Sequence, residues 1–132
     1  MKDQLVKVEQ FHETFRAYTG HVPTAKIPER VFEGRLKLLQ EELEEYRRAV
    51  EAGDLVEVAD ALTDMLYILL GTYIAHGLQG LAVELFDEVH RSNMSKLDEN
   101  GQPILNREGK VEKSALFSRP DLGPILAKYR LP

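Results

Sequence analysis

The spacing of hydrophobic residues along the chain predicts four main helices. Apolar side chains recur every three or four residues over about 2–18, 29–52, 54–77 and 81–94. Gly53 ends the second of these stretches, and Asp54 is placed to cap the third, with Glu57 three residues on as in a capping box. A short helical turn is expected at about 125–129. The pattern therefore predicts an all-α fold, a bundle of four to five helices.

The third predicted helix is apolar on nearly every side except one. At about 100° per residue, Glu57, Asp60 and Asp64 fall within an arc roughly 60° wide, which we call the acidic arc. Buried carboxylates need a proton, a basic partner or a metal ion. No Lys or Arg occurs between Arg48 and Arg91, which makes a divalent cation the leading explanation. Oxygen ligands of this kind suit Mg²⁺ or Mn²⁺ better than zinc.

The second predicted helix adds acids at 41–45. Such a run alone is typical of a solvent-exposed face, with Glu44 and Arg48 spaced for an i,i+4 ion pair. Glu42, however, lies at the edge of the apolar stripe, so it and Glu45 can lean toward the next helix. Because the connection at 53–54 is tight, the two helices must run antiparallel. We therefore expect Glu42 and Glu45 beside the acidic arc, next to Asp60 and Asp64 or next to Glu57 depending on the tilt of the helices. Such a cluster needs on the order of one to three divalent cations.

The segment after Met94 changes character. Turn signals at 100–101 and 108–109 separate two short runs, 103–105 and 110–112, which can pair as a small hairpin. Its basic residues are balanced by acids, so two interpretations stay open: a solvated loop, or a lid that faces phosphate groups. We expect one domain over 1–132, with core helices at about 2–95 and a lid or tail at about 96–132.

Composition narrows the function classes. The 132 residues, 43% of them hydrophobic, fit one domain with one core, and the absence of cysteine excludes disulfides and thiolate chemistry. A net charge of -5 argues against a nucleic-acid surface and favours a small-molecule partner. The longest apolar run, 65–75, is shorter than the roughly 20 residues that span a bilayer. We expect a cytoplasmic protein with neither membrane nor nucleic-acid partner, and a homodimer that covers the apolar third helix.

Two acidic motifs carry a family resemblance. Glu41-Glu42-x-x-Glu45, followed by Glu57-x-x-Asp60, resembles the signature of the MazG-like all-α nucleoside triphosphate pyrophosphohydrolases. The resemblance extends over nearly the whole chain. Within the superfamily, the chain is similar to the branch labelled phosphoribosyl-ATP pyrophosphohydrolase-like. Its further segments are Phe11-His12, Asp60-Ala-Leu-Thr-Asp64, Tyr67, Gly71, Val89 to Lys96, Gly109-Lys110-Val111 with Lys113, and Pro120-Asp-Leu122.

This resemblance implies hydrolysis between the α and β phosphates of a nucleotide, which yields a nucleoside monophosphate and pyrophosphate. Glu41 matches the first acid of the motif and is the candidate for orienting or deprotonating the attacking water. Asp64 would contact the metal ligands without binding the metal itself. Four acids would hold Mg²⁺, with Mn²⁺ as a substitute: Glu42, Glu45, Glu57 and Asp60.

The resemblance also implies which residues contact the substrate. Asn93 and Lys96 would face it, and Lys113 would join when the tail closes. His12 is a candidate for a hydrogen bond to the base, and Tyr67 for stacking on it. A structural role for His12 and Tyr67, and a plain surface position for Lys96, stay open.

The acidic motif is shared with dimeric dUTPases and with phosphoribosyl-ATP pyrophosphatases, so it specifies chemistry better than substrate. From the resemblance, dUTP or another noncanonical triphosphate, removed in nucleotide-pool house-cleaning, is the leading substrate, and phosphoribosyl-ATP is the alternative. A third possibility of another class is a non-catalytic helical module that binds a metal or a partner. Asp87 and His90 have the spacing of a di-iron ligand pair, but such sites need two copies of it and the chain has one.

Overall fold

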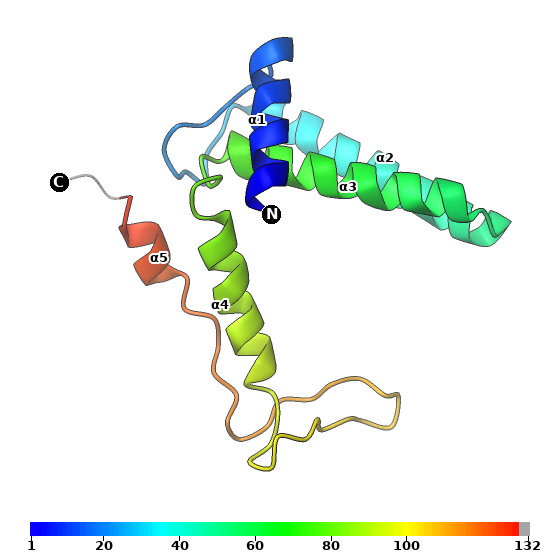
Figure 1. Ribbon diagram of the computed structural model, residues 1–132, viewed down its shortest axis with the longest axis vertical. Coiled ribbons are helices and arrows are strands. Elements are labelled where there is room, and N and C mark those ends of the chain that lie inside the picture. The colour runs from blue at the N-terminus through cyan, green and yellow to red at the C-terminus, as the bar shows by residue number, and fades with distance from the viewer. Residues whose placement is uncertain (130–132) are drawn as a thin grey trace. The chain divides into compact units, whose positions relative to one another are not determined.

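The protein is all-helical over residues 1–129, which a computed structural model describes (Figure 1). Its helices are α1 (Lys2–Phe15), α2 (Glu29–Ala52), α3 (Leu55–Ala75), α4 (Ala82–Met94) and α5 (Gly123–Ala127). The predicted fold class and the four main helices are confirmed. The chain divides into two compact units, Met1–Gly80 and Leu81–Pro132, which we describe one at a time. The single domain stays a prediction, and the last three residues of its predicted tail lie outside the described residues.

An antiparallel hairpin of α2 and α3 dominates the first unit (Figure 1). Gly53 ends α2 in the left-handed conformation, with φ 68°. The Asp54 side chain then accepts hydrogen bonds from the amides of Val56 and Glu57, at 3.0 and 3.2 Å. These bonds satisfy two of the free N–H groups at the start of α3. The short connection leaves the second helix no path except back along the first.

Helix α1 packs against the C-terminal half of α3. The Phe11 ring meets the Tyr67 ring edge to face, with 5.7 Å between centroids. Leu5 and Val8 of α1 are buried. The helix ends at Phe15, three residues before the predicted end, because Arg16 adopts the left-handed conformation with φ 55°. After this turn the chain runs toward the C-terminal end of α3.

A buried polar junction joins the three helices of this unit. His12 of α1 is 2% exposed, and its Nδ1 lies 2.8 Å from the Tyr18 carbonyl oxygen. Its Nε2 lies 3.0 Å from Nη2 of Arg35 on α2. A carbonyl only accepts and a guanidinium only donates, so His12 is neutral with its proton on Nδ1. Burial lowers the pKa of His12, the hydrogen bond to the Tyr18 carbonyl raises it in part, and the Arg35 charge lowers it again, so that the net shift is downward.

Gly71 of α3 completes the junction. A Cβ there would lie 2.7 Å from Arg35 Nη1 and 3.0 Å from His12 Nε2. Both distances are shorter than ordinary van der Waals contacts, so the two side chains meet over α3 only because position 71 has no side chain.

Much of α3 stays exposed and apolar. Leu62, Leu66 and Leu69 keep 49%, 50% and 44% of their surface exposed. By length and composition α3 is the one helix among residues 1–129 that could cross a membrane, with a mean hydropathy of 1.4. The core helices of soluble proteins meet the same criterion, and Asp60 and Asp64 lie along this helix.

In the second unit the C-terminal segment runs antiparallel along α4. The contacts move up α4 as the segment moves toward its end. The Arg91 guanidinium and the Asp121 amide both bond Glu88, and they lower its pKa to about 2. In chain order the paired positions are Ser118 with Ser95, Arg119 with Arg91, Asp121 with Glu88, and Lys128 with Glu84.

The predicted hairpin is present only as a single antiparallel bridge between Leu105 and Val111. Two turns have the same hydrogen-bond pattern. The first precedes the bridge, and the second connects the two bridged residues. In each, an Asp98 or Asn106 side-chain oxygen accepts the amides two and four residues on. A glycine with positive φ, 71° at Gly101 and 78° in the second turn, lets the chain reverse.

The junction generates a prediction about Gly71. Gly71→Ala should lower the free energy of unfolding by about 1 kcal/mol in urea denaturation. The added methyl displaces Arg35 and leaves His12 Nε2 buried without a donor, which costs about 1–3 kcal/mol. A gain of at most about 1 kcal/mol in helix propensity offsets only part of that loss.

Gly34 of α2 offers a matched control, because a Cβ there would meet nothing within 4 Å. Gly34→Ala should raise the free energy of unfolding by up to about 1 kcal/mol. Equal stabilisation by both alanines would show that the close approach at the junction is unimportant.

Candidate functional site

Glu42 is the centre of the candidate site. It lies on α2, half-buried, and its Oε2 is buried with no hydrogen-bond partner among the described residues. Burial raises the pKa of Glu42, and repulsion by Glu45, Asp64, Asp60 and Glu41 raises it further. The negative charges of both hairpin helices thus converge on one carboxylate that no basic group of the described residues contacts.

The acidic arc contributes Asp60 and Asp64 to this group. Both are exposed on α3, and both act on Glu42 across the hairpin. Glu57, one turn earlier, is exposed as well, and its amide is held by the Asp54 cap. Glu57 is not among the charges that shift Glu42. The structure therefore brings the middle of the arc to Glu42 and leaves Glu57 at its edge.

Oxygen ligands for a hard cation are present, but their side chains do not form a complete coordination site. Within residues 1–129, no three His, Asp or Glu side chains gather closely enough to hold a metal ion. The roles of Glu42, Glu45, Glu57 and Asp60 as ligands stay predictions. The unpartnered Oε2 of Glu42, with two α3 carboxylates near it, fits a divalent cation with oxygen ligands.

Two acids of the motif make only loose contacts with bases of their own helix. Glu41 Oε1 lies 3.8 Å from Lys37 Nζ, and Glu45 Oε1 lies 3.9 Å from an Arg48 nitrogen. Both distances exceed a hydrogen bond, and exposed pairs of this kind are worth under about 1 kcal/mol. Either carboxylate can leave its partner at little cost.

Glu44 differs from its neighbours. Its carboxylate accepts two hydrogen bonds from Arg47, at 2.6 and 3.2 Å. The predicted pair of Glu44 with Arg48 is therefore wrong, because Arg47, at i,i+3, donates from two of its nitrogens to the two carboxylate oxygens. Glu44 has a partner of its own, whereas Glu42 has none among the described residues.

The predicted substrate contacts of the second unit include one preformed pair. Lys96 Nζ donates a hydrogen bond of 2.8 Å to Asn93 Oδ1. Lys113 is held elsewhere in this unit, with its Nζ 4.8 Å from the centre of the Phe117 ring. Asn93 thus positions the Lys96 ammonium group, and the contacts of all three with substrate stay predictions.

Tyr67 and His12, the two predicted contacts of the first unit, both serve the packing of α1. Tyr67 is 38% exposed and supports Phe11. His12 has both ring nitrogens engaged at the buried junction. A contact between His12 and a nucleotide base would require the ring to give up one of those bonds.

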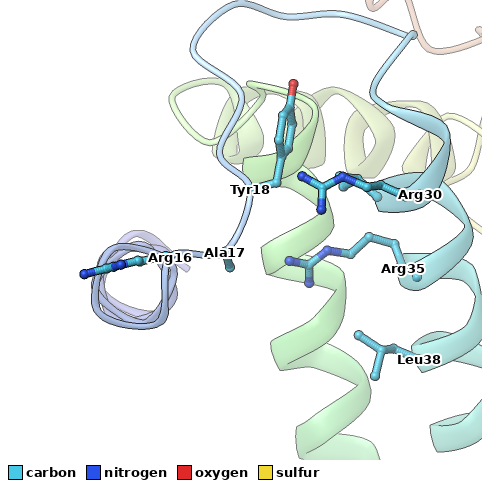
Figure 2. A pocket seen from close by; sticks show the side chains of 8 residues that line it. Arg16, Ala17, Tyr18, Arg30, Arg35 and Leu38 are labelled. Atoms are coloured by element: carbon cyan, nitrogen blue, oxygen red, sulfur yellow. The ribbon is translucent and has the colours of Figure 1, made fainter.

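A basic pocket beside the junction is absent from the sequence-based predictions. It has a volume of about 510 Å³ and lies between the end of α1 and the start of α2 (Figure 2). Tyr18, Arg30, Arg35 and Leu38 line it. The available signal is Arg35, a cation that interrupts the apolar stripe of α2 two turns before Glu42.

Comparison with known protein families identifies the class of reaction. The model of the phosphoribosyl-ATP pyrophosphohydrolase family matches residues 8–93, more than half of the chain. The matched stretch includes the junction, the acids of both hairpin helices and Asn93. No individual curated protein matches the sequence. The chain therefore belongs to the phosphoribosyl-ATP pyrophosphohydrolase family of the MazG-like all-α superfamily, and it is a nucleotide pyrophosphohydrolase, a hydrolase of acid anhydrides.

Proposed function

We propose that the protein is a Mg²⁺-dependent pyrophosphohydrolase that cleaves a nucleoside triphosphate between its α and β phosphates. The observation that carries this proposal is the buried oxygen of Glu42, which has no hydrogen-bond partner within residues 1–129 and is surrounded by four other carboxylates. A triphosphate is itself strongly negative, so it can approach these acids only with cations between them.

In this proposal Glu42, Glu45, Glu57 and Asp60 hold the metal. When bound, Mg²⁺ neutralises phosphate charge and lowers the pKa of a water molecule. Glu41 lies close enough to act on the charge of Glu42, and its loose contact with a lysine leaves its carboxylate available to orient or deprotonate the attacking water.

The basic residues of the second unit would bind the phosphates. Asn93 holds the Lys96 ammonium group by its side-chain oxygen and leaves the other ammonium protons available for a phosphate. Lys113 would donate to the same groups after leaving the Phe117 ring, a contact worth roughly 0.5–1 kcal/mol at an exposed site.

For the substrate, the motif resemblance favours dUTP or another noncanonical triphosphate. The family match favours phosphoribosyl-ATP equally well. A panel of dUTP, phosphoribosyl-ATP and the standard nucleotides, assayed for pyrophosphate with Mg²⁺, tests the proposal. We expect one panel member to yield pyrophosphate and a monophosphate. Release of inorganic phosphate in place of pyrophosphate, or no release from any nucleotide, would refute it.

The ligand assignment predicts the outcome of single substitutions. Glu42→Gln, Glu45→Gln, Glu57→Gln and Asp60→Asn should each reduce kcat by on the order of a hundredfold or more, because each removes negative charge that holds the cation in the transition state. Steady-state kinetics at saturating Mg²⁺ measures this.

The matched control is Glu44→Gln, one acid of the same run that bonds Arg47 on the exposed side of α2. Its kcat should stay within about twofold of wild type, since an exposed ion pair contributes under about 1 kcal/mol. Ligand variants as active as wild type beside an inactive Glu44→Gln would show that a different face of α2 carries the metal.

The exposed leucines of α3 support a proposed homodimer. Leu62, Leu66 and Leu69 follow the i, i+4, i+7 spacing of a helix face that packs on another helix. Light scattering at micromolar concentration should give about twice the 15.0 kDa chain mass. Leu66→Asp should shift the protein toward the monomer. A monomeric wild type would contradict the proposal.

A further inference from the structure

We infer that the pocket lined by Arg30 and Arg35 is a binding site for a phosphate monoester, separate from the acidic cluster around Glu42. The inference rests on how Arg35 is held, on the absence of a carboxylate partner for either arginine in the part of the chain that the structure describes, and on the size and position of the pocket.

Arg35 is fixed in place by its surroundings. Its Nη2 donates to Nε2 of His12, whose other nitrogen is tied to the Tyr18 carbonyl. Its Nη1 lies against the bare face of Gly71. A guanidinium has five N–H donors, and this arrangement commits one of them. The guanidinium, which lines the pocket, is thereby held in place before a ligand arrives, and this is the preorganisation that favours affinity.

Arg30 adds a second cation to the same space. It extends from the first turn of α2, and Figure 2 shows the Arg30 and Arg35 side chains on the same side of this helix, with Arg30 the nearer of the two to Tyr18 in this view. Arg16 also borders the pocket, but its side chain points away from the other two. The candidate ligand therefore meets two arginines.

Neither arginine has an acidic partner in the described part of the chain. No carboxylate of residues 1–129 forms an ion pair with Arg30 or Arg35, although the sequence contains 22 acidic residues and Arg47 on the same helix has two such partners. Burial lowers the pKa of Arg35, yet a guanidinium stays charged in proteins. Two arginines that line one pocket, neither of them paired with a carboxylate of residues 1–129, can accept an anion from solution.

The chemistry of the pocket favours a phosphate attached to an organic group. Paired guanidinium groups match the oxygens of a phosphate, which arginine binds in bidentate fashion. The volume of about 510 Å³ exceeds that of a bare phosphate and falls in the range of about 300–1,000 Å³ usual for small-molecule pockets. Tyr18 and Leu38 give apolar wall surface against which a sugar can lie.

The position of the pocket sets two possible sources of this phosphate. Arg35 precedes Glu42 by seven residues, which places it on the same face of α2 and about 10 Å along the helix. A substrate with a second phosphorylated end, such as phosphoribosyl-ATP, can supply the monoester itself. The other source is a separate phosphorylated sugar. The first source rests on the proposed function, whereas binding of the monoester does not.

Ribose 5-phosphate is the probe, titrated by calorimetry into the full chain without Mg²⁺ so that the acidic cluster binds no phosphate. We expect binding to wild type, no heat from unphosphorylated ribose, and at least about a tenfold loss of affinity in Arg30→Gln, the equivalent of one charged hydrogen bond. Arg35→Lys should lose as much, because the lysine keeps the charge and loses the planar fork.

Arg47→Gln is the matched control, since it removes the same charge from the same helix at an exposed ion pair. It should bind ribose 5-phosphate within about twofold of wild type. No binding to wild type, or an equal loss in Arg47→Gln and Arg30→Gln, would overturn the site.

Kinetics then distinguishes the sources. If Arg30→Gln raises the KM for phosphoribosyl-ATP at least about tenfold more than the KM for dUTP, the substrate supplies the monoester. If the two KM values change alike by less than about twofold while ribose 5-phosphate binding is lost, the ligand is a separate phosphorylated sugar. An equal, large rise for both nucleotides would mean that the pocket holds their shared triphosphate, and it would overturn the inference. A protein that cleaves no nucleotide refutes the proposed function, and the calorimetry still tests the pocket.

Discussion

Charge burial in the α2–α3 hairpin is the constraint from which the rest of the first unit follows. Glu42 points one oxygen into a space without any donor among the described residues, and carboxylates of its own helix and of α3 repel it. A fold optimised only for stability would replace such a group by an apolar side chain. Its presence supports the proposal that the hairpin binds a cation from solution.

Helix α2 also carries a positive charge two turns before Glu42. Arg35 is anchored there by His12 and by the close approach of Gly71, so one helix presents a fixed cation and, two turns later, an acid that needs a cation. In the proposed function and the inferred pocket, this order would separate two kinds of phosphate recognition along one helix. Metal-assisted binding suits the end where bonds break, and direct arginine binding suits an end that only has to be held.

The helices could be predicted because their signals are local. The apolar period, the Gly53 stop and the Asp54 cap all act within a few residues, and the structure has each of them. The end of α1 was placed three residues too late, because the left-handed turn at Arg16 depends on the backbone and has no glycine to mark it. The predicted hairpin shrank to one bridge, since short runs between two turns leave little room for a ladder.

In the candidate site, too, features set by local spacing could be predicted and features set by tertiary packing could not. The spacing of acids within each helix predicted that Glu42 and the α3 carboxylates would meet. The partner of Glu44 was misassigned because i,i+3 and i,i+4 arginines look alike in sequence. The basic pocket went unseen because its parts come from α1, the connection after it and α2, and only tertiary packing brings them together.

The central claim, that Glu42 is organised around a divalent cation, is tested most directly by thermal unfolding of wild type and Glu42→Gln with and without Mg²⁺. A ligand at 100 times its Kd stabilises the folded state by about 2.7 kcal/mol. We expect Mg²⁺ to raise the Tm of wild type and to leave Glu42→Gln nearly unchanged. Without Mg²⁺ the variant should be at least as stable as wild type, because the substitution removes a repelled charge. The same Mg²⁺ shift in both proteins, or none in wild type, would contradict this account.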